Sequence, residues 1–522
     1  MRGAEAARAA AAALKRHGPW VGFALGALQS LAFAPFAVWP LGVACLAALW
    51  WLWQGASPRR AALTGFGFGA GLFLAGTYWL YTSIHVFGQA PLALALLLML
   101  GLVAIMGVYT AVLAWLLRRF APDRPLPTLL TAFPAGWVLL EWFRGWFLSG
   151  FPWLAVGYSH LDTPLAGFAP VVGIYGVSLA VALTAGLALA ALELRGRTRA
   201  LLLGAIAVLW VGGALLGRIE WTTPAGAPLT VAIVQGAIPQ DLKWQENNRD
   251  HTLEVYRSLT QQALGARLIV WPEAALPLLY HEAVPFLATL YKDAQARGSD
   301  LVLGIVRYDF EAREVRNGLV VLGAQQEWYY KRRLVPFGEF FPVPGFVRDW
   351  MRLKSLAYVD FLAGARDQGA LDAAGQKLGA TICYEDAYAA EQLAVLADAT
   401  LLVNVSNDAW FGDSTAPHQH LQIARMRALE AGRWLIRATN NGVSALIDER
   451  GRLIARTRQF VPEVLTGTVV PRAGRTPYAY VGNWPVISVC FALLLAVAPW
   501  RGRRSPSASR GRPVPGAAMI GP

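Results

Sequence analysis

KLGATICYE (377–385) is an apolar run, typical of a buried strand, that ends at a cysteine followed by an aromatic and an acidic residue. Similar short β-rich runs alternate with helix-like stretches at 246–264, 282–297, 386–397 and 416–432. These runs are LTVAIVQG (229–236), RLIVWPE (267–273), LVLGIV (301–306), NGLVVLG (317–323) and TLLVNVSN (400–407). The alternation predicts an α/β domain. Several strands are apolar at consecutive positions, so we expect a sheet buried on both faces, with active groups at strand ends.

The rest of the chain has the composition of a membrane protein. Hydrophobic residues make up 56% of the 522 residues and charged residues only 15%. Apolar runs of transmembrane length predict an α-helical membrane bundle of eight spans. The spans lie near 20–36, 38–55, 61–81, 90–117, 127–148, 165–193, 200–217 and 479–499. Pro35 and Pro40 favour a tight reversal between the first two spans, and a single kinked helix is the alternative.

Basic residues indicate the orientation of the spans. Lys and Arg flank alternate ends of the spans, and the short loops around 37, 82–89 and 149–163 carry none. This alternation predicts that both termini are cytoplasmic. We therefore expect a membrane bundle at 1–217, a periplasmic domain at 218–478, the eighth span at 479–499 and a disordered cytoplasmic tail at 500–522. The net charge of +13 comes mostly from Arg beside the spans, which argues against a nucleic-acid binder.

Three residues of the inserted domain are candidates for chemistry. Cys383 follows a strand at the apparent start of a helix, where the helix dipole would favour a thiolate; a small buried hydrophobe is the alternative. Glu273 closes an apolar strand, where desolvation would raise its pKa towards that of a general base, and a helix N-terminal carboxylate is the alternative. Lys331, in WYYKRRLVPFGE, would stabilise a tetrahedral intermediate unless it is an ordinary solvated lysine. Cys45 and Cys490 lie in apolar spans, so no disulfide framework is expected.

The order and local contexts of these residues resemble the Glu-Lys-Cys triad of the nitrilase superfamily. Glu339, in VPFGE, matches the second glutamate that many members place beside the lysine. The resemblance implies an α-β-β-α sandwich in which Glu273 is the general base, Lys331 stabilises the oxyanion and Cys383 is the nucleophile. Tyr384 and Glu385 would be supporting residues.

A nitrilase-like domain placed before the last of eight spans is similar to bacterial apolipoprotein N-acyltransferases. Matching stretches include LAFAPFAVWPL (31–41), YWLYTSIHVFG (78–88), EWFRGWFLSGFPWLAVGYS (141–159), VQGAIPQDLKW (234–244), LVPFGEFFP (334–342), CYED (383–386), SNDAWFGDSTAPHQHLQIARMRALE (406–430) and TNNGVSA (439–445). The resemblance implies that Cys383 takes an acyl chain from the sn-1 ester of a phospholipid such as phosphatidylethanolamine. The N-terminal amine of an S-diacylglyceryl-cysteine apolipoprotein would then accept the chain. We also expect a monomer in the bacterial inner membrane, without a cofactor.

Aromatic side chains are the candidates for contact with lipid. Trp410 and Phe411 are expected to line an acyl pocket, with core packing as the rival interpretation. The apolar stretch between Gly338 and Gly364, which includes Phe341 and Trp350, is expected to form a lid at the membrane interface. A loop packed on its own domain is the alternative.

Two polar pairs have open roles. Glu141 and Arg144, near the outer end of the fifth span, either neutralise one another or face a substrate head group. No Cys or acidic cluster completes a metal site with His418 and His420, so no metal is expected.

Two other functions stay open. A membrane-tethered nitrilase-type amidase would use water as the second acceptor. A transporter with a soluble sensor domain is opposed by the scarcity of polar groups within the spans.

Overall fold

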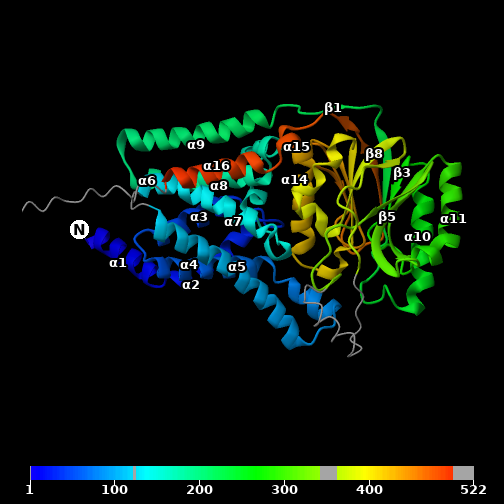
Figure 1. The fold of residues 1–522 in the computed structure, drawn as a ribbon, viewed down its shortest axis with the longest axis horizontal. Coiled ribbons are helices and arrows are strands. Elements are labelled where there is room, and N and C mark those ends of the chain that lie inside the picture. Colours follow the sequence, from blue (N-terminus) through cyan, green and yellow to red (C-terminus); the bar gives the residue numbers. More distant parts are fainter. Residues whose placement is uncertain (1, 122–124, 341–360, 498–522) are drawn as a thin grey trace, which may run out of the picture.

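The computed structural model describes residues 2–121, 125–340 and 361–497. A helical bundle lies beside a domain built on two β-sheets, and the two regions follow one another along the long axis of the molecule (Figure 1). The bundle contains α1 (Arg2–Arg16), α2 (Gly18–Gln29), α3 (Pro40–Trp53), α4 (Pro58–Gly76), α5 (Leu92–Phe120), α6 (Pro125–Pro127), α7 (Phe133–Arg144), α8 (Ala169–Glu193), α9 (Gly196–Leu216) and α16 (Trp484–Val497).

A helix lies in each predicted span, but the helices differ in length. Among the described residues, three helices are long and apolar enough to cross a membrane: Leu92–Phe120, Gly196–Leu216, and Pro164–Glu193, which joins a 3-10 turn to α8. The apolar helices α3 and α16 are shorter. Because α2 ends at Gln29 and α3 begins at Pro40, the alternative of a single kinked helix is wrong.

Glycines bring α4 very close to its two neighbours. A Cβ atom at Gly71 would lie 2.0 Å from the carbonyl oxygen of Phe23 in α2. One at Gly69 would lie 2.8 Å from the carbonyl oxygen of Met106 in α5. Lipid supplies no hydrophobic drive between helices, so close packing of small residues is what holds such helices together.

Two six-stranded sheets pack face to face in the second region. The first sheet has the order β13-β2-β3-β4-β5-β6, with β13 (Glu463–Val469), β2 (Leu229–Gln235), β3 (Leu268–Val270), β4 (Asp300–Asp309), β5 (Glu314–Leu322) and β6 (Gln326–Tyr330). The second has the order β12-β11-β10-β9-β8-β7, with β12 (Leu453–Arg456), β11 (Ala445–Ile447), β10 (Leu435–Thr439), β9 (Leu401–Ser406), β8 (Gln376–Ile382) and β7 (Leu371–Ala373). A separate antiparallel pair joins β1 (Thr223–Pro224) to β14 (Arg472–Ala473).

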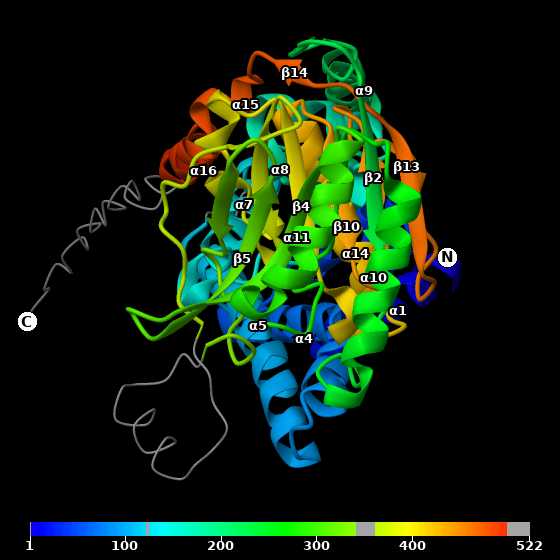
Figure 2. The same ribbon diagram turned by 90° about the vertical axis from the view of Figure 1, so that its right-hand side faces the viewer.

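Helices cover both outer faces, which confirms the α-β-β-α sandwich. α10 (Arg249–Ala263) and α11 (Tyr280–Ala296) pack on the first sheet and lie in front of it in Figure 2. α14 (Ala416–Ala431) packs on the second sheet. The strands β2, β3 and β4 are parallel, as are β8, β9 and β10, so the residues that follow them emerge at shared sheet edges.

α14 is buried on two sides because it lies between the second sheet and the bundle (Figure 1). Leu421, Ala424 and Ala428 pack towards the sheet. Ile423 and Met426 join the core of the bundle. The β-rich region therefore contacts the bundle directly through one helix.

The six predicted strands are confirmed, as are three of the four predicted helices of the domain. The helix expected at 386–397 is wrong: the four-residue α13 (Ala389–Gln392) lies between 3-10 turns at Cys383–Ala387 and Val395–Ala397. Tertiary contacts override the weak helical preference here. The Asp386 side chain bonds to His420, and the Tyr388 hydroxyl donates to the Gly150 carbonyl at 3.1 Å.

Replacing Gly71 with Ala should destabilise the bundle, because the new Cβ forces α2 and α4 apart. We expect a loss of about 1–3 kcal/mol, measured by thermal unfolding in detergent. Gly101→Ala is the matched control, since nothing lies within 4 Å of a Cβ at Gly101. A Gly71→Ala protein as stable as Gly101→Ala would contradict the close contact.

Candidate active site

Lys331 is the centre of a buried polar cluster. It follows β6, is 1% exposed, and its Nζ donates to Glu273 Oε1 at 2.9 Å and to Glu339 Oε1 at 2.8 Å. Asn317 of β5 donates to the same two oxygens at 2.7 and 3.1 Å. The backbone N–H of Asn407, after β9, donates to Glu273 Oε2 at 2.9 Å. The structure thus brings together Glu273, Lys331 and Glu339, as the sequence predicted. It adds Asn317 and Asn407, which the sequence did not indicate.

The charges in this cluster stabilise one another. Burial alone would raise the pKa of Glu273, but the Lys331 ammonium and hydrogen bonds from Asn317 and Asn407 together hold that pKa below its ordinary value. The expected rise in this pKa is therefore wrong, because the desolvated carboxylate contacts a buried cation. Burial would lower the pKa of Lys331, yet the Glu273 and Glu339 carboxylates raise it well above its ordinary value. Glu273 and Lys331 are accordingly both ionised at neutral pH.

Cys383 lies at the end of β8 in a strained turn. Its φ of +54° falls in the left-handed region, which is uncommon for a residue with a Cβ. Its carbonyl oxygen accepts hydrogen bonds from Asn404 Nδ2 at 3.4 Å and from His420 Nε2 at 3.2 Å. Sharp turns of this kind after a strand present nucleophiles in other enzymes.

The Cys383 thiol is protonated at rest. Burial raises the pKa of this thiol, the Glu273 carboxylate raises it further, and the Lys331 ammonium opposes both. The expected thiolate is therefore wrong. The reason is that Cys383 begins a five-residue 3-10 turn, so no long helix supplies a strong dipole. Any nucleophilic attack by Cys383 needs a base that removes the proton.

Glu385 joins the Cys383 segment to the Lys331 segment. Its Oε2 accepts from the Ile382 N–H at 2.7 Å and the Tyr329 hydroxyl at 2.9 Å. Its Oε1 accepts from the backbone N–H groups of Arg332 at 2.6 Å and Arg333 at 3.1 Å. One buried carboxylate therefore fixes the backbone after Lys331 relative to the turn at Cys383.

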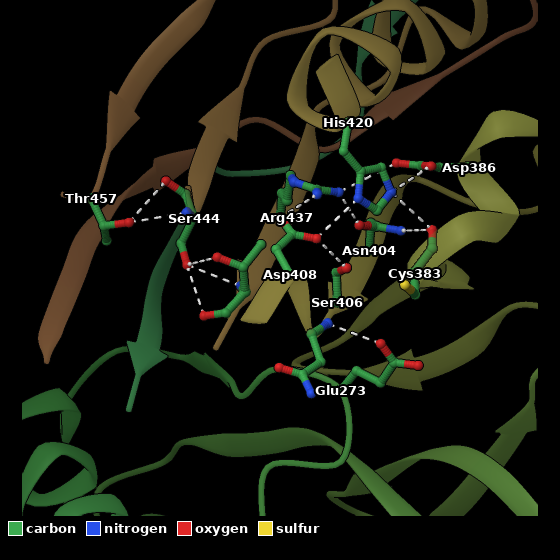
Figure 3. Close-up of polar contacts among 12 residues, drawn as sticks. Glu273, Cys383, Asp386, Asn404, Ser406, Asp408, His420, Arg437, Ser444 and Thr457 are labelled. Carbon is green, nitrogen blue, oxygen red and sulfur yellow. Dashed lines mark hydrogen bonds and ion pairs between the residues drawn. The ribbon is translucent and has the colours of Figure 1, made fainter. Parts of the chain in front are cut away.

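A second buried charge cluster lies beside Cys383 (Figure 3). His420 Nδ1 and Nε2 lie 3.0 Å from Asp408 Oδ1 and Asp386 Oδ1. Arg437 Nη2 and Nη1 lie 3.0 Å from Asp408 Oδ2 and 3.3 Å from Asp386 Oδ2. All four side chains are buried, and their two positive charges match two negative charges. In the sequence, His420 is considered only as a possible metal ligand, and that role is rejected. The signal that was missed is the pair of acidic residues that follow β8 and β9, Asp386 and Asp408, together with Arg437 within β10.

The residues expected to contact lipid lie at the junction of the domain and the bundle or outside the described residues. Phe411 is partly buried and packs edge-on against Trp79, with ring centroids 4.9 Å apart. Trp410 is 40% exposed, and its carbonyl accepts a hydrogen bond from Ser83 at 2.8 Å. Both lie where the domain meets the bundle. Phe341, Trp350 and most of the expected lid lie outside the described residues.

Tyr384, expected as a supporting residue, also contacts the bundle. Its hydroxyl donates to the Gly150 carbonyl at 3.2 Å. Its ring is stacked against Trp153, with centroids 6.3 Å apart. The residue that follows Cys383 is therefore held by a loop of the bundle.

Glu141 and Arg144 have backbone partners. Glu141 Oε1 accepts from the Val156 N–H at 2.8 Å, and Arg144 Nη1 donates to the Phe151 carbonyl at 2.9 Å. Arg144 also donates to the Trp153 carbonyl. Both side chains therefore hold the loop that follows α7, a role that sequence did not indicate.

Comparisons with known proteins agree with this architecture. Residues 230–478 match the family described as "Carbon-nitrogen hydrolase", and residues 25–187 match "Apolipoprotein N-acyltransferase N-terminal domain". A CN-hydrolase superfamily protein from Xanthomonas campestris has a solved structure that is 18% identical, with a TM-score of 0.36; the match covers 97% of that chain and 50% of this one. The two family matches define the class, which is a carbon–nitrogen hydrolase domain attached to a helical membrane region.

Relatives along nearly the whole chain define the family. An apolipoprotein N-acyltransferase from Methylococcus capsulatus is 44% identical over 93% of this chain and 97% of its own length. One from Azotobacter vinelandii is 46% identical over 91% of this chain and 94% of its own length. The chain belongs to the apolipoprotein N-acyltransferase family.

The second charge cluster makes a prediction about pH. Burial and Arg437 lower the pKa of His420, but Asp386 and Asp408 raise it to about 9. The protonated imidazole therefore stabilises the fold fully below pH 6.5, by about 3 kcal/mol, and this contribution is lost as the pH rises through 9. We expect the difference in Tm between the unmodified protein and His420→Gln to be widest below pH 6.5 and to narrow by pH 9.

His418→Gln is the control, because His418 lies two residues away on the same helix and outside the cluster. Thermal scans at fixed detergent concentration would measure both variants. A His420→Gln difference that does not narrow, or an equal narrowing for His418→Gln, would contradict the assigned charge.

Proposed function

We propose that the chain transfers an acyl chain from a phospholipid, such as phosphatidylethanolamine, to the N-terminal amine of a diacylated apolipoprotein. The observation that carries the proposal is the cluster of Glu273, Lys331 and Glu339, in which the Glu273 and Lys331 charges act on the protonated thiol of Cys383. Two relatives that share more than two fifths of their residues with this chain are apolipoprotein N-acyltransferases. No cofactor takes part in the proposed chemistry.

In the first half-reaction, Cys383 is the nucleophile and Glu273 is the general base. The thiol proton passes to Glu273 while Sγ attacks the sn-1 ester carbonyl. Lys331 stabilises the negative oxygen of the tetrahedral intermediate. The carbon–oxygen bond then breaks, and the leaving alkoxide takes the proton from Glu273. A lysophospholipid leaves, and a Cys383 thioester remains.

In the second half-reaction, the free amine of the apolipoprotein attacks the thioester. Its proton passes to Glu273, the carbon–sulfur bond breaks, and the Cys383 thiolate recovers the proton from Glu273. The product is an amide. The lowered pKa of Glu273 makes its protonated carboxyl group a ready proton donor to the leaving alkoxide and then to the thiolate, whereas removal of the proton from the Cys383 thiol, whose pKa is raised, is the uphill step.

The supporting residues act by position. Glu339 and Asn317 hold Lys331 and Glu273 in contact, and Glu385 holds the turn at Cys383. Tyr384 connects that turn to the bundle. Trp410 and Phe411 are proposed to line the path of the acyl chain at the junction with the bundle. The lid containing Phe341 and Trp350 is proposed from sequence alone.

We also propose the topology that the basic residues indicate. Eight spans would place 1–217 and 479–499 in the bacterial inner membrane, the domain at 218–478 in the periplasm and the tail at 500–522 in the cytoplasm. Support comes from the helix present in each predicted span. A domain attached at both ends to a membrane has few ways to associate, so we propose a monomer.

The thioester is the test of this function. Intact-mass measurement after incubation with phosphatidylethanolamine should show one added acyl chain that hydroxylamine removes. Cys383→Ser should show no hydroxylamine-labile chain, while Cys45→Ser should behave as the unmodified protein. An acyl chain on another residue would overturn the nucleophile. Release of ammonia from small amides without any thioester would favour the amidase instead.

Glu273→Gln should slow thioester formation by about 10² or more, because the amide cannot accept the thiol proton. Single-turnover mass measurements would give the rate. Glu254→Gln, at an exposed position of α10, is the control and should keep the parent rate. A Glu273→Gln rate within a few-fold of the parent would assign Glu273 a structural role.

A further inference from the structure

The cluster around Lys331 is not electrically balanced by its own members. Glu273 and Glu339 are two carboxylates, and both bind the same ammonium. The nearby charge of Asp408 is already matched, because Asp408 pairs with Arg437 and His420. The Glu339 side chain is 15% exposed to solvent, but Glu273 is buried, so a further cation near Glu273 would offset the cost of its charge.

Lys243 is a candidate for this cation because its side chain is fully buried. Its neighbours in sequence, Leu242 and Trp244, are apolar yet 39% and 55% exposed, whereas Lys243 is 0% exposed. Its Nζ has no hydrogen-bond partner among the described residues. Lysine is almost never fully buried without a partner, and here the usual pattern of apolar inside and charged outside is inverted. Packing alone does not account for this arrangement.

The fold places the turn that carries Lys243 at the same sheet edge as Glu273, whose carboxylate acts electrostatically on the Lys243 ammonium. β2 and β3 are parallel neighbours, so the turn after β2 and Glu273 after β3 emerge at the same sheet edge. Asn407 ties the two together: its N–H binds Glu273, and its side chain donates to Gln240 at 2.9 Å. The Lys243 N–H donates to the Pro239 carbonyl at 3.0 Å, which fixes the turn.

We propose that Lys243 is a positioning residue, a second ammonium that keeps the buried reaction centre neutral and Glu273 ionised. The proposal rests on the proposed roles of Glu273 and Lys331. With Lys243, two ammonium groups face two carboxylates at rest. Transfer of the thiol proton to Glu273 moves charge only within the site, so the tetrahedral intermediate is neutral too: Glu339 and the oxyanion face Lys331 and Lys243.

The charged and titratable groups around Glu273 come from each element that packs there. They are Lys243 after β2, Lys331 and Glu339 after β6, Cys383 after β8 and Asp408 after β9. Burial lowers the pKa of Lys243 to about 8, against the opposing pull of the Glu273 carboxylate. The ammonium thus predominates at neutral pH and is held at a cost to folding.

Lys243→Met tests the proposal through the pH dependence of thioester formation with phosphatidylethanolamine vesicles. Loss of a cation raises the pKa of a nearby carboxylate, so the acid limb of the rate profile should move to higher pH by about half a unit or more. Lys243→Arg keeps the charge and should leave the limb in place. Lys292→Met, at an exposed position of α11, is the matched control.

Thermal unfolding separates this role from a structural one. Nζ makes no hydrogen bond with the described residues, so Lys243→Met should keep or raise the Tm at pH 7. An unmoved acid limb in Lys243→Met, a moved limb in Lys243→Arg, or a fall in Tm of more than about 3 °C in Lys243→Met would each overturn the proposal. Absence of the thioester in the unmodified protein would instead overturn the proposed function itself.

Discussion

The buried ammonium of Lys331 contacts two carboxylates, and the positions of many other residues follow from that contact. Charges away from water are stable only when partners lie at hydrogen-bond distance, so Glu273 and Glu339 need fixed backbones. Asn317 on β5 supplies one restraint and the N–H of Asn407 on the facing sheet supplies another. Because groups from both sheets meet at Glu273, the sandwich has to hold its two sheets in one relative position for the cluster to exist.

The turn at Cys383 likewise depends on buried charges that have close partners. A left-handed residue with a side chain persists only where its surroundings hold it. His420 and Asn404 bind the Cys383 carbonyl, and the position of His420 is fixed by two aspartates that Arg437 also binds. The strained backbone conformation of Cys383 is thus maintained by a histidine whose ion pairs are buried too deeply for dissolved salt to screen.

The strands could be predicted because apolar runs are local features, whereas the Glu-Lys-Cys residues were proposed from residues at strand ends together with the resemblance to the nitrilase superfamily. The protonation states could not be predicted, since they depend on partners distant in sequence. The apolar segment around Glu273 suggests only a desolvated carboxylate. The fold shows that Lys331, 58 residues later, donates a hydrogen bond to it. The failed helix at 386–397 has the same cause, because Asp386 and Tyr388 bond to α14 and the bundle. Lys243 carried no local signal either: a lysine before a tryptophan in a polar turn is ordinarily exposed.

The bundle does more than anchor the domain, because its polar residues reach the turn at Cys383 through a loop. Arg144 and Glu141 bind the backbone between Phe151 and Val156. Trp153 in that loop donates to Gln419 of α14 at 2.7 Å, one residue before His420. The hydroxyl groups of Tyr384 and Tyr388 donate to the Gly150 carbonyl, which lies just before that loop. A shift of α7 would therefore act on two residues that contact or adjoin Cys383: Tyr384, which follows it, and His420, which binds its carbonyl. The domain cut from its bundle would therefore keep the Lys331 cluster and the bonds of His420 and Asn404 to the turn, but it would lose the bonds of Tyr384 and Tyr388 to the Gly150 carbonyl.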